Sequence, residues 1–118
     1  MTTSPRISTR QEDGVTVIRF NDHHLFDERT VRDVAEQITA ALPKDGSPIR
    51  LILDFSGVEL ISSSLLSKLI LLQRKIDGTG GKLRLCELSG ILQSVFRTSN
   101  LDRLFGIDRD ARASLSMF

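Results

Sequence analysis

Residues 51–69 of the 118-residue chain read LILDFSGVELISSSLLSKL, and this stretch decides the fold. It begins with a nearly all-apolar run of the kind found in strands that are covered on both faces of a sheet. A short turn follows, and three serines then open a run whose leucines have helical spacing. The stretch therefore predicts a strand, a turn and a helix in direct succession, with Asp54 at the carboxyl end of the strand.

The serine cluster Ser62–Ser64 lies where the predicted helix begins. A serine here commonly accepts a hydrogen bond from an unpaired backbone N–H, and such a cap stabilises a helix by about 1 kcal/mol. Three serines exceed what a cap requires, and no Glu or Gln follows three residues later to complete a capping box. A phosphoserine would add about −1.5 to −2 charges at the positive end of the helix dipole and close to Asp54. The cluster therefore fits either a helix cap or a phosphorylation site.

The sequence on either side of this stretch alternates between strand and helix patterns. Asp13-Gly14 is a strong tight-turn signal, and Pro43, Gly46 and Pro48 end the first helix. The predicted elements are strands at Arg6–Gln11 and Val15–Phe20, a polar loop at Asn21–Asp27, a helix at Glu28–Leu42, a strand at Ile49–Leu53, a helix at Ser63–Ile76, a strand at Lys82–Cys86, a helix at Ser89–Ser99, a short extended piece around Phe105–Ile107 and a final helix from about Asp108 to Leu115. The order β-β-α-β-α-β-α-β-α predicts an α/β fold, a single compact domain over residues 1–118 with a mixed sheet of about four to five strands and about four helices.

The composition is that of an ordinary soluble globular domain. Apolar residues make up 40% and charged residues 26%, and a formal net charge of +1 gives no argument for nucleic-acid binding. The single Cys86 excludes a disulfide framework and suits a reducing compartment. Met1–Arg10 lacks the apolar segment of a signal peptide, and no run approaches the ~20 apolar residues of a membrane span. We therefore expect a cytoplasmic protein without membrane insertion.

Two motifs that resemble cofactor sites lack the required context. His23 and His24 are flanked by Asp22 and Asp27, but adjacent side chains on one loop rarely converge on a metal ion without further ligands. Gly78–Lys82 contains glycines and a lysine, yet a phosphate-binding loop must follow a strand and precede a helix. Here the glycines follow a helix, so they predict a helix end and a turn. We expect no metal, nucleotide or other cofactor.

A serine hydrolase is not predicted either. The Gly-x-Ser-x-Gly elbow is absent, and Leu65 and Leu66 follow the serines in place of a glycine-lined oxyanion site. His23 and His24 are the only histidines that could act as a base. Because no catalytic constellation is present, we expect a protein that is not an enzyme.

The helix after the serines has an inward and an outward side. The inward side is predicted to carry Leu66, Leu69, Ile70, Gln73 and Ile76. The outward side is predicted to carry Ser64, Ser67, Lys68, Leu71 and Lys75. An outward leucine beside a candidate modification site indicates a docking surface. Together with the terminal Met117-Phe118, Leu71 also leaves room for a weak homodimer.

The central stretch resembles the signature of STAS domains, a family typified by bacterial anti-sigma-factor antagonists. The matching segments are Leu53–Val58 and Ile61–Leu66, and the similarity continues through Gly80–Leu83, Val95-Phe96 and Asn100–Phe105. The resemblance implies a non-enzymatic, partner-switching regulator of transcription. In the family, the unphosphorylated antagonist binds an anti-sigma factor that is also its serine kinase. Phosphorylation breaks that complex, and a serine phosphatase resets it.

Laid onto this chain, the resemblance makes Ser63 the phosphorylated serine. Asp54 matches the aspartate at the strand end in the family, and Asp27 matches an acidic residue in the facing loop. The residues expected to bind the partner are Asp27, Asp54, Ser64, Lys68 and Leu71.

The chain departs from the family pattern close to the expected phosphorylation site. Ser62 stands where the family usually has Asp, and Leu65 and Ser67 stand where it usually has Gly. We expect the bulky Leu65 to alter kinase docking and the missing aspartate to remove one contact. The departures leave three alternatives: a divergent kinase, phosphorylation at Ser62 or Ser64 instead, or a domain that no longer switches.

STAS-like domains also accompany membrane transporters and stress-signalling assemblies. The alternative function is therefore a soluble STAS scaffold subunit of a transporter or stress-signalling complex, without phosphorylation. An enzyme of unknown class is the least favoured alternative.

Overall fold

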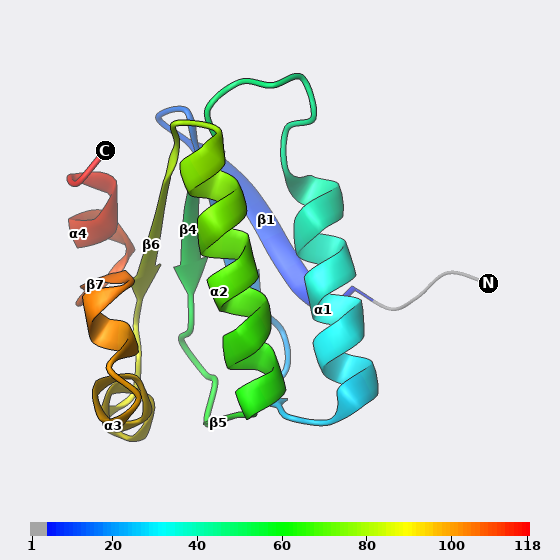
Figure 1. Cartoon of the computed structure of the whole chain (residues 1–118), viewed down its shortest axis with the longest axis vertical. Coiled ribbons are helices and arrows are strands. Elements are labelled where there is room, and N and C mark those ends of the chain that lie inside the picture. The colour runs from blue at the N-terminus through cyan, green and yellow to red at the C-terminus, as the bar shows by residue number, and fades with distance from the viewer. Residues whose placement is uncertain (1–4) are drawn as a thin grey trace.

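The computed structural model describes residues 5–118, so residues 1–4 of the predicted domain lie outside the described part. The strands are β1 (Ile7–Glu12), β2 (Val15–Phe20), β3 (His24–Leu25), β4 (Arg50–Asp54), β5 (Leu60–Ile61), β6 (Lys82–Cys86) and β7 (Gly106–Asp108). The helices are α1 (Glu28–Ala41), α2 (Ser63–Gly78), α3 (Gly90–Thr98) and α4 (Ala111–Leu115), with a 3₁₀ turn η1 (Leu101–Arg103). Figure 1 shows α1 and α2 side by side in front of the strands.

Five of the strands form one mixed sheet in the order β1-β2-β4-β6-β7. β1 and β2 pair as an antiparallel hairpin, whereas the other neighbours are parallel. At the hairpin turn, Asp13 and Gly14 have φ angles of 53° and 79°, the left-handed region that a two-residue Asp-Gly turn requires. The predicted α/β fold, with a mixed sheet of five strands and four helices, is confirmed.

Side chains of the central strand β4 alternate between the two faces of the sheet. Leu51 and Leu53 point into the main core beneath α1 and α2, whereas Ile52 belongs to a smaller cluster on the opposite face. That smaller cluster consists of Val15, Val17, Ile52 and Cys86, against which Ala111 and Leu115 of α4 and the terminal Phe118 pack. We call these two sides the front face and the back face of the sheet.

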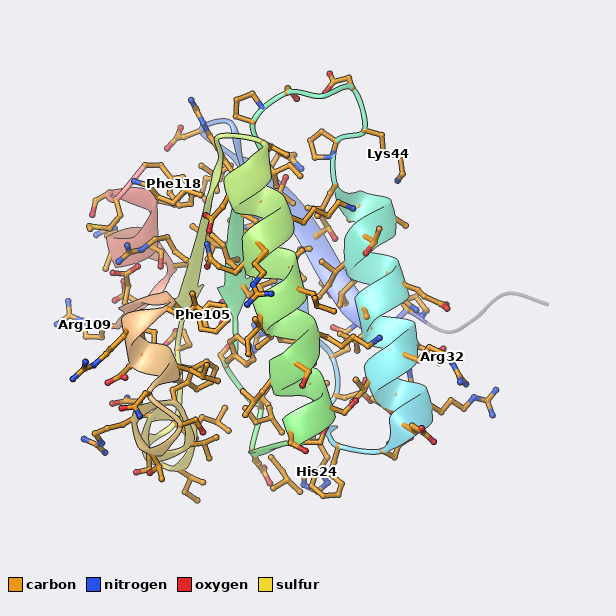
Figure 2. All side chains as sticks on the ribbon, viewed as in Figure 1. His24, Arg32, Lys44, Phe105, Arg109 and Phe118 are labelled. Atoms are coloured by element: carbon orange, nitrogen blue, oxygen red, sulfur yellow. The ribbon has the colours of Figure 1, made fainter. Side chains whose placement is uncertain are left out.

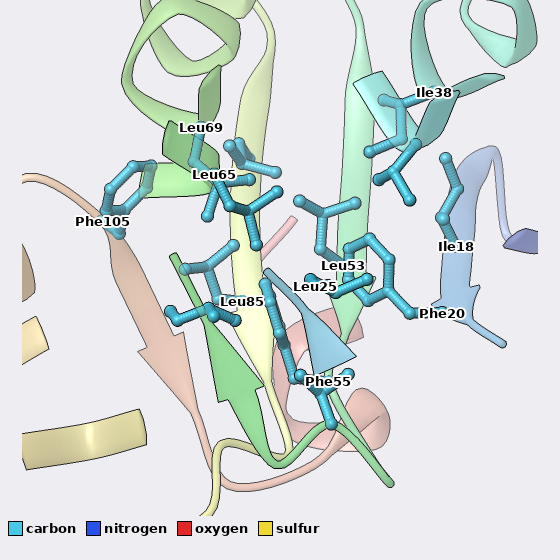
Figure 3. Close-up of a cluster of buried hydrophobic side chains, with 14 of the residues drawn as sticks. Ile18, Phe20, Leu25, Ile38, Leu53, Phe55, Leu65, Leu69, Leu85 and Phe105 are labelled. Atoms are coloured by element: carbon cyan, nitrogen blue, oxygen red, sulfur yellow. The ribbon is translucent and has the colours of Figure 1, made fainter. Parts of the chain in front are cut away.

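The main core fills the space between the front face and the helices. Figure 3 shows Leu69 of α2 and Leu53 of β4 within this cluster of branched and aromatic side chains. The rings of Phe20 and Phe55 lie 4.8 Å apart between centroids, within the range of favourable aromatic pairs. This packing holds α1 and α2 on the sheet and thereby positions their first turns.

Two segments predicted as loop contain short strands. β3 and β5 pair in parallel as a separate two-stranded sheet, with His24 opposite Leu60 and Leu25 opposite Ile61. A strand of two residues has too little periodicity to be recognised in a sequence. The prediction of a continuous polar loop over residues 21–27 is therefore wrong at β3.

The inward side of α2 also differs in part from the prediction. Leu69, Gln73 and Ile76 are buried as expected, but Leu66 and Ile70 are only partly buried. Leu65, expected beside the phosphorylation site, is 1% exposed and packs in the main core. The helix is therefore turned so that Leu65 rather than Leu66 faces the sheet.

Candidate functional site

Ser62 is the N-cap of α2. Its backbone is extended, with φ −95° and ψ 163°, and its Oγ accepts a hydrogen bond of 3.1 Å from the backbone N–H of Leu65. The backbone N–H of Ser62 in turn donates to the carbonyl oxygen of Leu25 at 3.0 Å. Because Ser62 is 9% exposed and its hydroxyl is engaged, it performs the capping role within the serine cluster.

Ser63 and Ser64 are the first two residues of α2, and both are exposed. Within residues 5–118, neither hydroxyl takes part in a hydrogen bond of the fold, although the Ser63 carbonyl oxygen accepts one from the Ser67 hydroxyl at 3.2 Å. The backbone N–H groups of a helix's first turn lack acceptors within the helix, and the dipole favours negative charge there. A phosphate on either side chain would therefore be stabilised locally by the helix end.

The two-stranded sheet places the starts of α1 and α2 next to each other. β3 ends at Leu25 and β5 ends at Ile61, and these two residues are paired. Two residues after each lie Asp27, the N-cap of α1, and Ser63, the first residue of α2. Because paired parallel strands run in the same direction, the residues that follow them leave the small sheet on the same side. Asp27 and the serine cluster therefore belong to one surface. Figure 2 shows His24 of β3 at this end of the two helices.

Asp27 carries negative charge at this surface. Its Oδ2 accepts a hydrogen bond of 3.0 Å from the backbone N–H of Thr30, and hydrogen bonding to Thr30 lowers the pKa of the Asp27 carboxyl. The neighbouring Phe26 and Leu60 are 55% and 42% exposed. Sequence reasoning missed these two residues, although an aromatic residue within a polar loop was a usable signal. We call Phe26, Asp27, Leu60, Ser63 and Ser64 the switch surface.

Asp54 points to the face of the sheet opposite α1 and α2. By the alternation of β4 it lies on the back face, where it neighbours Cys86 and contributes, after burial, to raising the pKa of that thiol to about 12. Asp54 is 7% exposed, and its Oδ1 accepts a hydrogen bond of 2.9 Å from the backbone N–H of Ser56. No hydrogen bond among the described residues joins Asp54 to a serine of the cluster. Its local role is to hold the turn after β4.

Lys68 and Leu71 lie on a different edge of α2 from Ser63. Both line a groove between α1 and α2, and Leu71 is 59% exposed as predicted. Residues three or four apart on a helix are neighbours, so Ser64 precedes Lys68 on this edge, whereas Ser63 precedes Ser67 on another. The predicted binding residues of α2 therefore share one edge of the helix, and the predicted phosphorylation site Ser63 lies on another.

The histidines make structural contacts. His23 Nδ1 lies 2.8 Å from the carbonyl oxygen of Gly57, which can only accept, so this nitrogen is the donor. His24 Nε2 lies 3.6 Å from a carboxylate oxygen of Glu59, and both side chains are exposed. Within residues 5–118, no group of three or more His, Cys, Asp or Glu side chains is arranged to hold a metal ion. Over the same residues, no helix has the length and apolar content needed to span a bilayer.

Solved structures share the fold over most of the chain. An anti-sigma-factor antagonist (STAS) domain protein from Planctomyces limnophilus is 26% identical, with a TM-score of 0.80, covering 94% of this chain and 97% of that one. The Bacillus cell-fate determinant SpoIIAA, solved in its phosphorylated form, is 18% identical, with a TM-score of 0.69 and coverages of 95% and 99%.

A further structural match lies within a much longer protein. The murine anion transporter Solute Carrier 26 family member A9 is 16% identical, with a TM-score of 0.78, over 92% of this chain but 18% of the transporter. No curated protein sequence matches the chain significantly. The family model of the STAS domain matches residues 6–114, which is nearly the whole chain. The protein therefore belongs to the STAS domain family.

Proposed function

We propose that the protein is an anti-sigma-factor antagonist whose partner binding is switched off by phosphorylation at Ser63. One observation carries the proposal: buried Ser62 supplies the helix cap, which leaves the exposed Ser63 hydroxyl available at the positive end of α2. The Planctomyces relative is described as an anti-sigma-factor antagonist domain, and SpoIIAA exists in a phosphorylated form. Both descriptions support the assignment.

The proposed partner is an anti-sigma factor that is also a serine kinase. It docks on the switch surface, where exposed Phe26 and Leu60 offer apolar contacts beside the Asp27 carboxylate. A phosphate on Ser63 adds about −1.5 to −2 charges beside these apolar side chains and beside Asp27, so a docked partner meets a desolvation cost and like-charge repulsion. A typical coupling energy of ~1–3 kcal/mol would weaken binding about 5–150-fold. A serine phosphatase restores the binding form, and the protein itself is not an enzyme and acts in the cytoplasm.

The departures from the family pattern are compatible with this proposal. Ser and Asp are both preferred N-cap residues, so Ser62 can cap the helix in place of an aspartate. Leu65 is buried in the core, so its bulk does not obstruct a kinase at the surface. These two positions therefore support retention of the switch, and Ser64 remains the alternative exposed serine.

The first experiment maps the phosphate. The protein is incubated with ATP and a lysate of its source cells, digested, and analysed by mass spectrometry. We expect phosphate on Ser63, its loss in Ser63→Ala, and its retention in Ser64→Ala and Ser67→Ala. Unmodified serines at all three positions of the cluster would remove the basis of the switch.

The second experiment measures partner binding. Wild-type protein and the variants Ser63→Asp and Ser67→Asp are used as baits in the same lysate, and retained proteins are identified and quantified. We expect wild type and Ser67→Asp to retain an ATP-binding anti-sigma factor and Ser63→Asp to lose it. Equal retention by all three baits would contradict a switch at Ser63.

A scaffold without phosphorylation is the second candidate, because the fold also occurs as a segment of an anion transporter. As a scaffold, the chain would act as a separate subunit of a transporter or stress-signalling complex. Recovery of a transport ATPase in the binding experiment, with no anti-sigma kinase and unmodified serines, favours this function.

A further inference from the structure

A groove between α1 and α2 lies outside the switch surface. Its volume is about 540 Å³, and its floor is formed by Val34 and Ile38 of α1 and Leu65 and Leu69 of α2. None of the serines of the cluster lines it. Volumes of 300–1,000 Å³ with mainly apolar lining, between packed helices, are typical of small-ligand sites.

The charged residues around this groove favour an anionic ligand. Lys44, Lys68 and Lys75 line it, against the single carboxylate of Glu36. Among residues 5–118, none of the three lysines forms an ion pair. Lys44 Nζ lies 3.4 Å from the carbonyl oxygen of Thr39, at the end of α1, so Lys68 and Lys75 are the ammonium groups left for a ligand.

The length of the groove favours a small ligand over a docked helix. An α-helix rises 5.4 Å per turn, so the roughly 10 Å of groove between Lys68 and Lys75 matches about two turns. Helices this short are not stable in water, so the groove is too short for a helical partner. A single alkyl chain fits it better, because Lys68 and Lys75 are seven residues apart and flank about 10 Å of apolar groove.

We propose that the α1–α2 groove binds a free fatty acid of medium chain length. The alkyl chain lies on the floor between the two helices, and the carboxylate is held at one end of the groove by the ammonium group of Lys68 or of Lys75. Burial of the alkyl chain supplies the hydrophobic part of the binding, and charge-assisted hydrogen bonds from lysine select the anionic head group. This inference goes beyond the proposed function, since neither the ligand nor the groove involves Ser63.

The test uses decanoate as the probe, with decanol and decyltrimethylammonium as neutral and cationic analogues, all below their micelle-forming concentrations. Binding is followed by ¹H–¹⁵N NMR of the full chain. We expect saturable shifts confined to residues 34–44 and 65–75, and decanoate binding about tenfold tighter than decanol, as one charge-assisted contact provides. Absence of saturation, equal binding of the analogues, or shifts elsewhere would overturn the proposal.

Matched variants test the two parts of the site. Lys68→Glu/Lys75→Glu should weaken decanoate binding at least about tenfold, whereas Arg74→Glu, an exposed charge reversal on α2 outside the groove, should change it less than twofold. Ala35→Leu fills the groove from α1 and should weaken decanoate and decanol alike; it provides an independent test if the double variant does not fold. Unchanged binding in a folded groove variant contradicts the assignment.

A membrane surface is the other source of acyl chains and anionic head groups. Sedimentation of the protein with phosphatidylglycerol vesicles tests binding to a membrane surface. Vesicle binding without saturable decanoate binding would replace the free fatty acid by a membrane surface and so overturn the proposal.

Discussion

The two faces of the sheet are stabilised in different ways. On the front face, aliphatic and aromatic side chains from three helices and the strands form one large cluster. On the back face, Val15, Val17, Ile52 and Cys86 form a small cluster beneath the five-residue helix α4. That small cluster adjoins a polar network in which Asp108 of β7 joins Arg84 of β6 to Ser114 of α4. The comparison teaches that burial of apolar side chains holds α1 and α2 on the sheet, whereas the attachment of α4 also depends on directed hydrogen bonds.

The largest effect is expected from a cavity in the front face. Leu69→Ala removes a side chain that is 1% exposed, and it should lower the free energy of unfolding by about 2–5 kcal/mol. Chemical denaturation at pH 7 measures it. The matched control is Leu71→Ala on the same helix, which should cost at most about 0.5 kcal/mol because Leu71 is 59% exposed. Similar losses in both variants would contradict the packing described for α2.

A smaller loss is expected from the polar network of the back face. Asp108 accepts hydrogen bonds from Arg84 Nε and Nη2 at 2.9 and 2.8 Å and from the buried Ser114 hydroxyl at 2.7 Å. Asp108→Asn should lower the free energy of unfolding by about 1–3 kcal/mol, because it leaves these donors without the charged acceptor. The exposed Asp102→Asn is the control, and it should be close to neutral. A neutral Asp108→Asn would show that the network adds nothing to the small apolar cluster.

The same carboxylate gives the back face a dependence on pH. Hydrogen bonds from Arg84 hold the pKa of Asp108 below its ordinary value of 3.8. As the pH falls through 3.8 the unfolded chain takes up this proton first, so the stabilisation present at neutral pH is lost progressively until the pH passes below the lowered pKa of the folded state. Denaturation of wild type and Asp108→Asn between pH 7 and 2.5 should give curves that converge in acid. A constant separation would exclude the charge of Asp108 as the cause.

The smallest loss is expected at the cap of α2 on the front face. Ser62→Ala should lower the free energy of unfolding by about 1 kcal/mol, because it removes the acceptor for the backbone N–H of Leu65. Ser63→Ala should change stability by at most about 0.5 kcal/mol, since the exposed Ser63 hydroxyl forms no hydrogen bond within residues 5–118. Thermal unfolding of both variants makes the comparison. A larger loss of stability in Ser63→Ala than in Ser62→Ala would show that Ser63, and not Ser62, caps the helix.

Periodicity predicted the larger elements because each carries enough residues to show a pattern. The strands β2, β4 and β6 and the helices α1 and α2 begin and end at or near their predicted bounds. Their leucines and valines supplied the pattern from which they were predicted. The short strands β3 and β5 escaped prediction, and with them the exposed side chains of Phe26 and Leu60. The face of the sheet on which Asp54 lies was not predicted, for a different reason. The direction in which the last residue of a strand points depends on the register of the whole strand.

By itself, the sequence determined the order of strands and helices, the single α/β domain, the serine cluster at a helix start and the resemblance to STAS domains. Those properties are local, so each is encoded in residues close together in the chain. Only the tertiary structure decided that Ser62 caps the helix while Ser63 is exposed, because the pairing of β3 with β5 buries Ser62. It also decided that Asp54 lies on the back face and that the α1–α2 groove is lined by lysines that form no ion pair within residues 5–118. These are relations between segments distant in sequence, and packing against a common sheet is what brings them together.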